Sequence, residues 1–62
     1  MKLKDLIESK IIKDSTELWI WNYPFPGVIH GKWFEDKILK FLERNIESFT
    51  YNRTDDVDVY LR

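Results

Sequence analysis

The single histidine of this chain, His30, is the strongest candidate for a residue that takes part in catalysis. A histidine base needs a nucleophile beside it and a third group that orients it. The chain has no cysteine, and a hydroxyl such as that of Ser48 has no identifiable base and orienting group in the sequence. Gly31 and Lys32 lack the GxxxxGK[ST] pattern of a phosphate-binding loop. We therefore predict that the chain is not an enzyme and that His30 is a structural or surface residue of a strand.

Carboxylates are the other groups that could carry out chemistry. Asp55, Asp56 and Asp58 offer the oxygen ligands that Mg²⁺ and Ca²⁺ prefer, but they lack the glycine and terminal glutamate of a calcium loop. We interpret them as a solvated hairpin that protects an edge strand from aggregation. Glu35 and Asp36 suit the first turn of a helix, where negative charge is favourable. We predict no metal site and no cofactor, because a chain without cysteine and with one histidine also lacks the usual zinc ligand sets.

Aromatic side chains are unusually frequent: the 62 residues include three tryptophans, three tyrosines and four phenylalanines. Each such ring can bury roughly 150–250 Å². A domain of this size has few fully interior positions, and its core supplies only about 3–5 kcal/mol of net stability. We therefore expect some of the rings to be exposed or half-exposed. The rings belong to Trp19, Trp21, Tyr23, Phe25, Trp33, Phe34, Phe41, Phe49, Tyr51 and Tyr60.

Four of these rings are close together in the sequence and form the candidate partner-binding site: Trp19, Trp21, Tyr23 and Phe25. Side chains of a strand alternate between its faces, so either the tryptophans or their aliphatic neighbours face the core. Three roles stay open for the tryptophans: tertiary core, a homodimer contact, or recognition of a foreign partner. Because Trp and Tyr are enriched at binding hot spots, a binding function competes here with a structural one.

Two amphipathic helices should support this aromatic stretch. Leu3, Leu6, Ile7 and Ile11 follow the i, i+3, i+4, i+8 spacing of one helix face, which predicts a helix over residues 2–10. A helix this short is marginal in water, so its apolar stripe must dock on another element.

The second helix is predicted over residues 35–44. Its buried stripe consists of Ile38, Phe41 and Leu42, and we expect Phe34 to join that stripe. Acidic residues in the first turn and basic residues near the end agree with the helix dipole.

Four strands complete the pattern, over residues 17–22, 28–33, 46–51 and 57–62. The first two are predicted to pair antiparallel through a proline-containing loop, since proline cannot donate within a sheet. The last two should form a hairpin, with polar residues 52–56 as its connection. We predict one α+β domain over residues 1–62, in the order α-β-β-α-β-β. Its expected architecture is one small antiparallel sheet with both helices packed on one face, and the order of the strands in the sheet is left open.

The two strands of the last hairpin differ in how clearly they alternate. Val57 and Val59 alternate with Asp58 and Tyr60, which is typical of a half-buried strand. In the preceding strand, simple alternation places Glu47 on the same face as Phe49 and Tyr51.

The charge balance argues against a duplex-DNA-binding protein, because ten Lys and Arg against 11 Asp and Glu give a net charge of −1. Binding of single-stranded nucleic acid is an alternative, in which rings stack on bases and a basic strip follows the backbone. That strip would consist of Lys32, Lys37, Lys40 and Arg44. No apolar run resembles a signal peptide or a membrane span, so we expect a cytoplasmic protein without a membrane partner or a small-molecule substrate.

One resemblance extends this interpretation. Residues 31–44 (GKWFEDKILKFLER), followed by residues 46–49 (IESF) and the alternating terminal strand, resemble short orphan accessory proteins of Gram-positive bacteriophages and mobile elements. The amino-terminal LKDLI segment also fits this pattern, whereas the tryptophan-rich stretch departs from it. Some proteins of this kind are anti-defence factors, including anti-CRISPR inhibitors. The resemblance implies an accessory protein in a bacterial host. Our leading hypothesis is a non-catalytic factor that binds a host protein and occludes its surface; the alternatives are the nucleic-acid-binding module and a structural homodimer.

Overall fold

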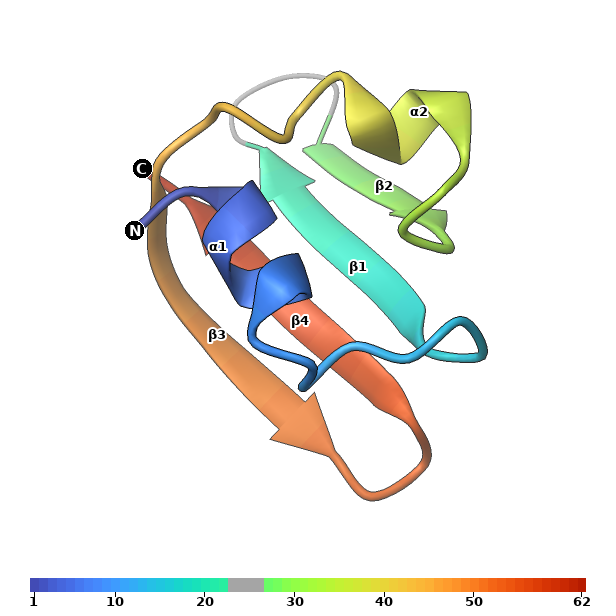
Figure 1. Ribbon diagram of the computed structural model, residues 1–62. Coiled ribbons are helices and arrows are strands. Elements are labelled where there is room, and N and C mark those ends of the chain that lie inside the picture. The colour runs from blue at the N-terminus through green and yellow to red at the C-terminus, as the bar shows by residue number, and fades with distance from the viewer. Residues whose placement is uncertain (23–26) are drawn as a thin grey trace.

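The computed structural model describes residues 1–22 and 27–62, and its helices and strands follow the order that the sequence predicts (Figure 1). All four predicted strands are confirmed, with small shifts at their ends, and both helices are shorter than predicted. No helix in this described part of the chain has the length and apolar character needed to cross a lipid bilayer. The elements are α1 (Leu3–Glu8), β1 (Glu17–Asn22), β2 (Gly27–Gly31), α2 (Asp36–Leu39), β3 (Ile46–Asn52) and β4 (Asp56–Leu61).

The strands form one mixed sheet in the order β2-β1-β4-β3. The two predicted antiparallel pairs, β1 with β2 and β3 with β4, are confirmed. The prediction of an entirely antiparallel sheet is wrong, because β1 and β4 are parallel neighbours at its centre. The inward side chains of these two strands are the most deeply buried of the sheet, because each central strand has a neighbouring strand on both sides. The side chains are Leu18, Ile20, Val57 and Val59, all with 0% exposure.

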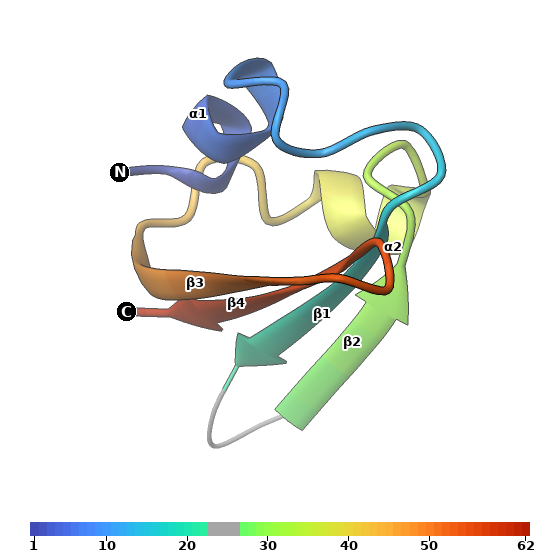
Figure 2. The same cartoon turned by 90° about the horizontal axis from the view of Figure 1, so that it is seen from below.

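Both helices lie on one side of the sheet, as predicted, and the hydrophobic core fills the space between the two layers (Figure 2). Leu3 and Leu6 of α1 are fully buried there, as is Ile38 of α2. Phe41, Ile12 and Ile46 close the core at its margins, each with less than a tenth of its surface exposed.

The first helix ends earlier than its hydrophobic spacing predicts. It begins with the Lys2 N–H donating to Asp5 Oδ2 at 2.9 Å and ends at Glu8. Lys10 then adopts a φ of 69°, a left-handed conformation that reverses the chain. Ile12 therefore enters the core at 6% exposure, and Ile11, the residue predicted to do so, is 37% exposed.

The second helix stops at Leu39, and the prediction that it continues to residue 44 is wrong. The chain goes on in turns across the sheet to reach β3 (Figure 1), with the Phe41 N–H donating to the Ile38 carbonyl at 2.9 Å. Two carbonyls beyond the helix, those of Leu42 and Arg44, accept the N–H groups of the first turn of α1, which have no acceptor within that helix. Tertiary contacts thus override helix propensity.

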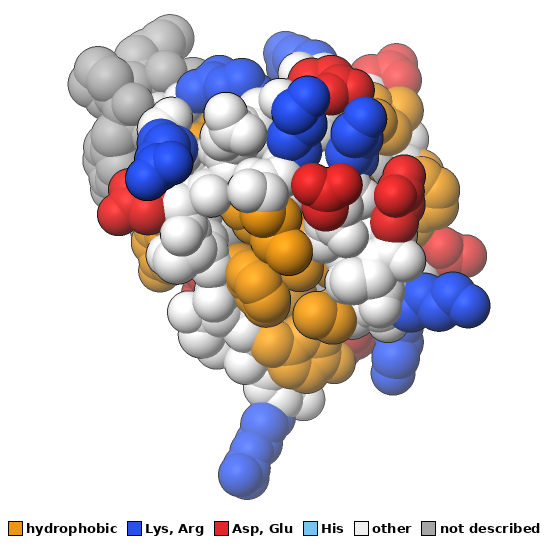
Figure 3. Space-filling model, turned by 60° about the vertical axis from the view of Figure 1, so that its left-hand side comes forward, with side chains coloured by type: hydrophobic (Ala, Val, Ile, Leu, Met, Phe, Trp, Pro, Cys, Tyr) orange, Lys and Arg blue, Asp and Glu red, His pale blue; other side chains and the backbone are white. Residues whose placement is uncertain are grey.

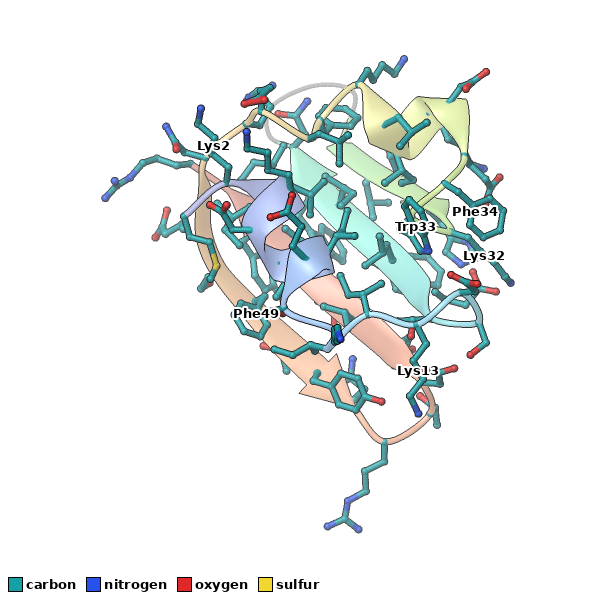
Figure 4. All side chains as sticks on the ribbon, viewed as in Figure 1. Lys2, Lys13, Lys32, Trp33, Phe34 and Phe49 are labelled. Atoms are coloured by element: carbon teal, nitrogen blue, oxygen red, sulfur yellow. The ribbon has the colours of Figure 1, made fainter. Side chains whose placement is uncertain are left out.

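The predicted stripe of the second helix is only partly confirmed. Ile38 and Phe41 are buried and Leu42 is half-buried, but Phe34 is 50% exposed. Its ring packs edge-on against Trp33 instead, with centroids 5.7 Å apart, and the two lie beside Lys32 after the end of β2 (Figure 4).

An ion-pair cluster ties α1 to the segment before β3. Lys2 Nζ and Lys4 Nζ each lie 3.1 Å from a different oxygen of the Glu43 carboxylate. The hydrogen bond from Lys2, and after it the one from Lys4, lowers the pKa of Glu43. The hydrogen bond to Glu43 in turn raises the pKa of Lys4. Elsewhere, a hydrogen bond from Lys32 lowers the pKa of Glu17, and bonds from Ser15 and then Thr16 lower the pKa of Asp55.

These shifts predict an acid-sensitive fold. A carboxyl whose pKa is lowered on folding stabilises the folded state above its unfolded pKa, and this stabilisation is lost as the pH falls through the folded value. The free energy of unfolding should therefore decrease below about pH 4.5. In urea denaturation followed from pH 7 to pH 2, Glu43→Gln should show a smaller decrease than the natural chain. Lys2→Met/Lys4→Met should show the same reduction, since it removes the other side of the cluster. Superimposable profiles for all three proteins would contradict this prediction.

Candidate functional site

The two tryptophans of β1 lie on the face of the sheet opposite the core. Leu18 and Ile20 point toward the helices with 0% exposure, whereas Trp19 and Trp21 point the other way and are half-buried. Within the described residues, no helix covers that second side (Figure 2). The alternative in which the tryptophans form the hydrophobic core is therefore wrong. We call this side, on which no described helix lies, the open face; it carries Glu17, Trp19, Trp21, Val28, His30, Glu47, Ser48, Thr50, Asn52, Asp56, Asp58 and Tyr60.

Trp19 is held against a side chain of the neighbouring strand. Its register partner on β2 is His30, and the two rings stack with centroids 3.9 Å apart and planes 6° from parallel. His30 Nε2 lies 2.8 Å from Glu17 Oε2, and Lys32 Nζ lies 3.1 Å from Glu17 Oε1. The histidine lies on a strand, as predicted. Its ring stacks on Trp19 and its Nε2 atom contacts Glu17, so it helps to hold both side chains in place on the open face.

Trp21 is positioned from the other side of β1. The parallel register places it beside Tyr60 of β4, with ring centroids 6.2 Å apart and planes 16° from parallel. The Trp21 indole N–H donates to Asp58 Oδ1 at 3.2 Å, and Asn52 Nδ2 donates to Asp58 Oδ2 at 3.2 Å. Three large rings therefore lie on adjacent central strands in orientations that neighbouring side chains hold.

Tyr60 is a member of this site that the sequence analysis did not assign. It is 39% exposed. The alternation of β4, with Val57 and Val59 buried, indicates that Tyr60 faces away from the core. Only the parallel pairing of β1 with β4 places it beside Trp21, and local patterns do not encode that pairing.

A β-bulge completes the site. The register between β3 and β4 shifts between Ile46 and Ser48, so simple alternation fails at Glu47, in the strand whose alternation is the less clear of the last two. Ile46 is buried, and Glu47 joins Ser48 on the open face. An extra residue of this kind re-aims side chains and is frequent at sheet edges. The result is an open hollow of about 410 Å³, lined by Trp21, Glu47, Ser48, Tyr60 and Leu61.

The aspartates of the last hairpin have a structural role rather than a shared ligand position. Asp55 Oδ2 and Oδ1 accept the hydroxyls of Ser15 and Thr16 at 2.6 and 2.7 Å. Asp55 has a φ of 60°, a conformation that Asp tolerates better than most residues. The interpretation of this hairpin as merely solvated is therefore incomplete. In the described part of the chain, no group of three or more His, Asp and Glu side chains is placed to hold a metal ion.

The structure does not gather the predicted basic strip on the open face. Of its four residues, Lys32 contacts the open face by its ion pair with Glu17. Lys37, in α2, lies 3.7 Å from the carboxylate of Glu35. Arg44 lies 3.5 Å from the side-chain oxygen of Asn22, which by alternation belongs to the same face of β1 as the buried Leu18 and Ile20. Lys40 is exposed at the end of α2.

Two predicted partner-binding residues, Tyr23 and Phe25, lie outside the described residues. A second hydrophobic surface lies on the side that carries β3 and both termini, where apolar side chains gather between charged ones (Figure 3). Met1, 62% exposed, and Tyr51, 46% exposed, belong to that side of the molecule.

The fold and the site define a small α+β domain: a four-stranded mixed sheet with two short helices on one side and an aromatic open face on the other. No protein-family model matches the chain, and neither the curated proteins nor the solved structures include one with significant similarity.

Proposed function

We propose that this chain is a non-catalytic protein-binding module whose contact surface is the open face. The observation that carries this proposal is the row of Trp19, Trp21 and Tyr60 on central strands that no described helix covers. Such rings supply large contact areas, and Trp and Tyr dominate the energetics of many interfaces. Stacking and hydrogen bonds already hold these rings, which reduces the ordering cost of association.

The surroundings of the rings favour a protein over a nucleic acid. Carboxylates of Glu17, Asp56 and Asp58 lie on the open face, where they would repel phosphate groups. Polar side chains around an apolar centre are the usual anatomy of a protein interface. Among protein-binding roles, the resemblance to phage and mobile-element accessory proteins favours an inhibitor that occludes a surface of a host protein.

A pull-down with a matched control tests this proposal. The tagged natural chain and a Phe34→Ala variant, which removes an exposed ring outside the open face, should capture the same bacterial protein. Trp19→Ala/Trp21→Ala should lose that capture, because the variant removes the centre of the contact surface. Tyr60→Ser, a milder change at an exposed position, should weaken it. Circular dichroism establishes that each variant is folded. Undiminished capture by the folded double variant would refute the role of the open face.

Two further measurements address the alternatives. Tryptophan quenching by a single-stranded oligonucleotide at low salt, relieved at high salt, would favour nucleic-acid binding over our proposal. Light scattering at several protein concentrations reports whether the chain self-associates. If Trp19→Ala/Trp21→Ala abolished self-association without affecting capture, the open face would be a homodimer contact instead.

A further inference from the structure

We infer that the hollow beside Trp21 and Tyr60 is a receptor for a cationic side chain, and specifically for an arginine of the protein that the open face binds. This inference rests on the proposed protein-binding function and specifies the chemistry of its partner. It follows from the composition of the hollow, from the charges around it, and from the geometry of the guanidinium group.

The hollow combines an aromatic wall with a carboxylate. Trp21 and Tyr60, nearly parallel at 16°, contribute the aromatic side. The bulge in β3 supplies Glu47 and the Ser48 hydroxyl on the other side, and Leu61 contributes apolar surface. A cation over an aromatic face gains about 0.5–2 kcal/mol, and a neighbouring carboxylate adds a charge-assisted hydrogen bond.

Glu47 differs from the other carboxylates of the open face, because its side chain has no partner among the described residues. Glu17 is paired with Lys32 and His30, and Asp58 accepts hydrogen bonds from Trp21 and Asn52. The Glu47 side chain, in contrast, makes no hydrogen bond or ion pair with any residue that the structure describes, and Glu47 is exposed.

The charge of the whole open face points the same way. It carries four carboxylates, those of Glu17, Glu47, Asp56 and Asp58, and Lys32 reaches it by its ion pair with Glu17. Such a surface attracts a basic partner and repels phosphate. Electrostatic complementarity of this kind increases association rates and excludes partners of the wrong charge.

Arginine satisfies both walls of the hollow at once. Its planar guanidinium can stack on the Trp21 or Tyr60 ring while its edge donates two parallel hydrogen bonds to the Glu47 carboxylate. A lysine ammonium, which is compact and strongly hydrated, satisfies one wall less well. Arginine is also enriched at the energetic centres of protein interfaces.

Titration of the folded chain with peptides, followed by two-dimensional ¹H–¹⁵N NMR, tests this inference. A tetra-arginine peptide should shift the Trp21 indole N–H and the amides of Glu47 and Tyr60 in a saturable manner. A tetra-citrulline peptide, which has the same shape without the charge, should bind about tenfold more weakly, and tetra-lysine should fall between the two.

Two substitutions that each remove one carboxylate charge separate the site from general attraction. Glu47→Gln should weaken tetra-arginine binding by about tenfold, whereas Glu8→Gln, at an exposed position of α1, should leave it unchanged. Equal binding of citrulline and arginine peptides, or equal effects of the two substitutions, would overturn the inference. Tighter binding of an oligothymidylate than of tetra-arginine in the hollow would also overturn it, in favour of nucleic acid.

The outcome is separable from that of the pull-down. Capture that depends on Trp19 and Trp21, without arginine binding in the hollow, would refute this inference and leave the protein-binding function intact. Arginine binding in the hollow without any captured protein would support the cationic site and count against the proposed function.

Discussion

Replacing Ile20 with alanine should leave a large part of the protein unfolded at 25 °C. Ile20 has 0% exposure at the centre of β1, where it lies between Ile29 of β2 and Val59 of β4. Truncating a buried isoleucine to alanine costs about 2–5 kcal/mol, and a domain of this size has about 3–5 kcal/mol in total. The loss of one side chain is therefore comparable with the whole net stability.

Urea denaturation followed by tryptophan fluorescence measures this effect. Val28→Ala is the control, because Val28 lies on the edge strand β2 and is 42% exposed, so it should cost less than about 1 kcal/mol. Ile20→Val should cost about 0.5–1.5 kcal/mol and keep both the fold and binding through the open face. An Ile20→Ala variant with the unfolding midpoint of the natural chain would show that β1 is not a central strand.

Replacing Thr16 with valine should destabilise the fold by about 1–3 kcal/mol, even though the two side chains have nearly the same shape. Thr16 is fully buried, and its hydroxyl accepts the Lys13 N–H at 2.9 Å and donates to Asp55 Oδ1 at 2.7 Å. Valine keeps the packing and removes both hydrogen bonds. The Lys13 N–H and one carboxylate oxygen of Asp55 then lose their partner inside the protein.

Two matched substitutions isolate the role of this hydroxyl. Thr16→Ser keeps the hydroxyl and should retain most of the stability, and Thr50→Val makes the same change at an exposed position of β3 and should have an effect below about 0.5 kcal/mol. Thr16→Val should also weaken the acid dependence of stability, because the Thr16 hydrogen bond contributes to the lowered pKa of Asp55. Equal stability of Thr16→Val and the natural chain would mean that this hydrogen-bonded link contributes nothing.

The correct predictions from sequence came from residues whose environment is set by their neighbours along the chain. The alternation of Leu18 and Ile20 with Trp19 and Trp21 placed a strand with the observed ends. The hydrophobic spacing of Leu3 and Leu6 placed the first helix. The error at residues 40–44 arose where contacts with α1 replace those of a helix, and the error at Ile11 arose where Lys10 turns the chain. Phe34, before α2, packs on Trp33 instead of joining the buried stripe.

The candidate site was predictable only in part. Trp19 and Trp21 were identified because a small domain cannot enclose so many rings, and the structure places them on the open face. Tyr60 and Glu47 were not identified, because one requires the parallel pairing of β4 with β1 and the other requires a bulge. Alternation gives the face of Tyr60 but not its neighbour on β1, and the bulge moves Glu47 to the face opposite the one that alternation assigns to it.

The sequence by itself determined the order and approximate places of the strands and helices, though not where the two helices end. It also determined the alternation in β1 that puts aliphatic side chains on one face and aromatic side chains on the other. Burial periodicity is a local property, and nearest neighbours along the chain suffice to define it. The tertiary structure alone decided that Tyr60 stacks beside Trp21, that Glu47 joins them, and that Asp55 binds the loop before β1. These contacts join residues far apart in the chain. They can form, and stabilise the fold, only after the strands have paired in the observed register.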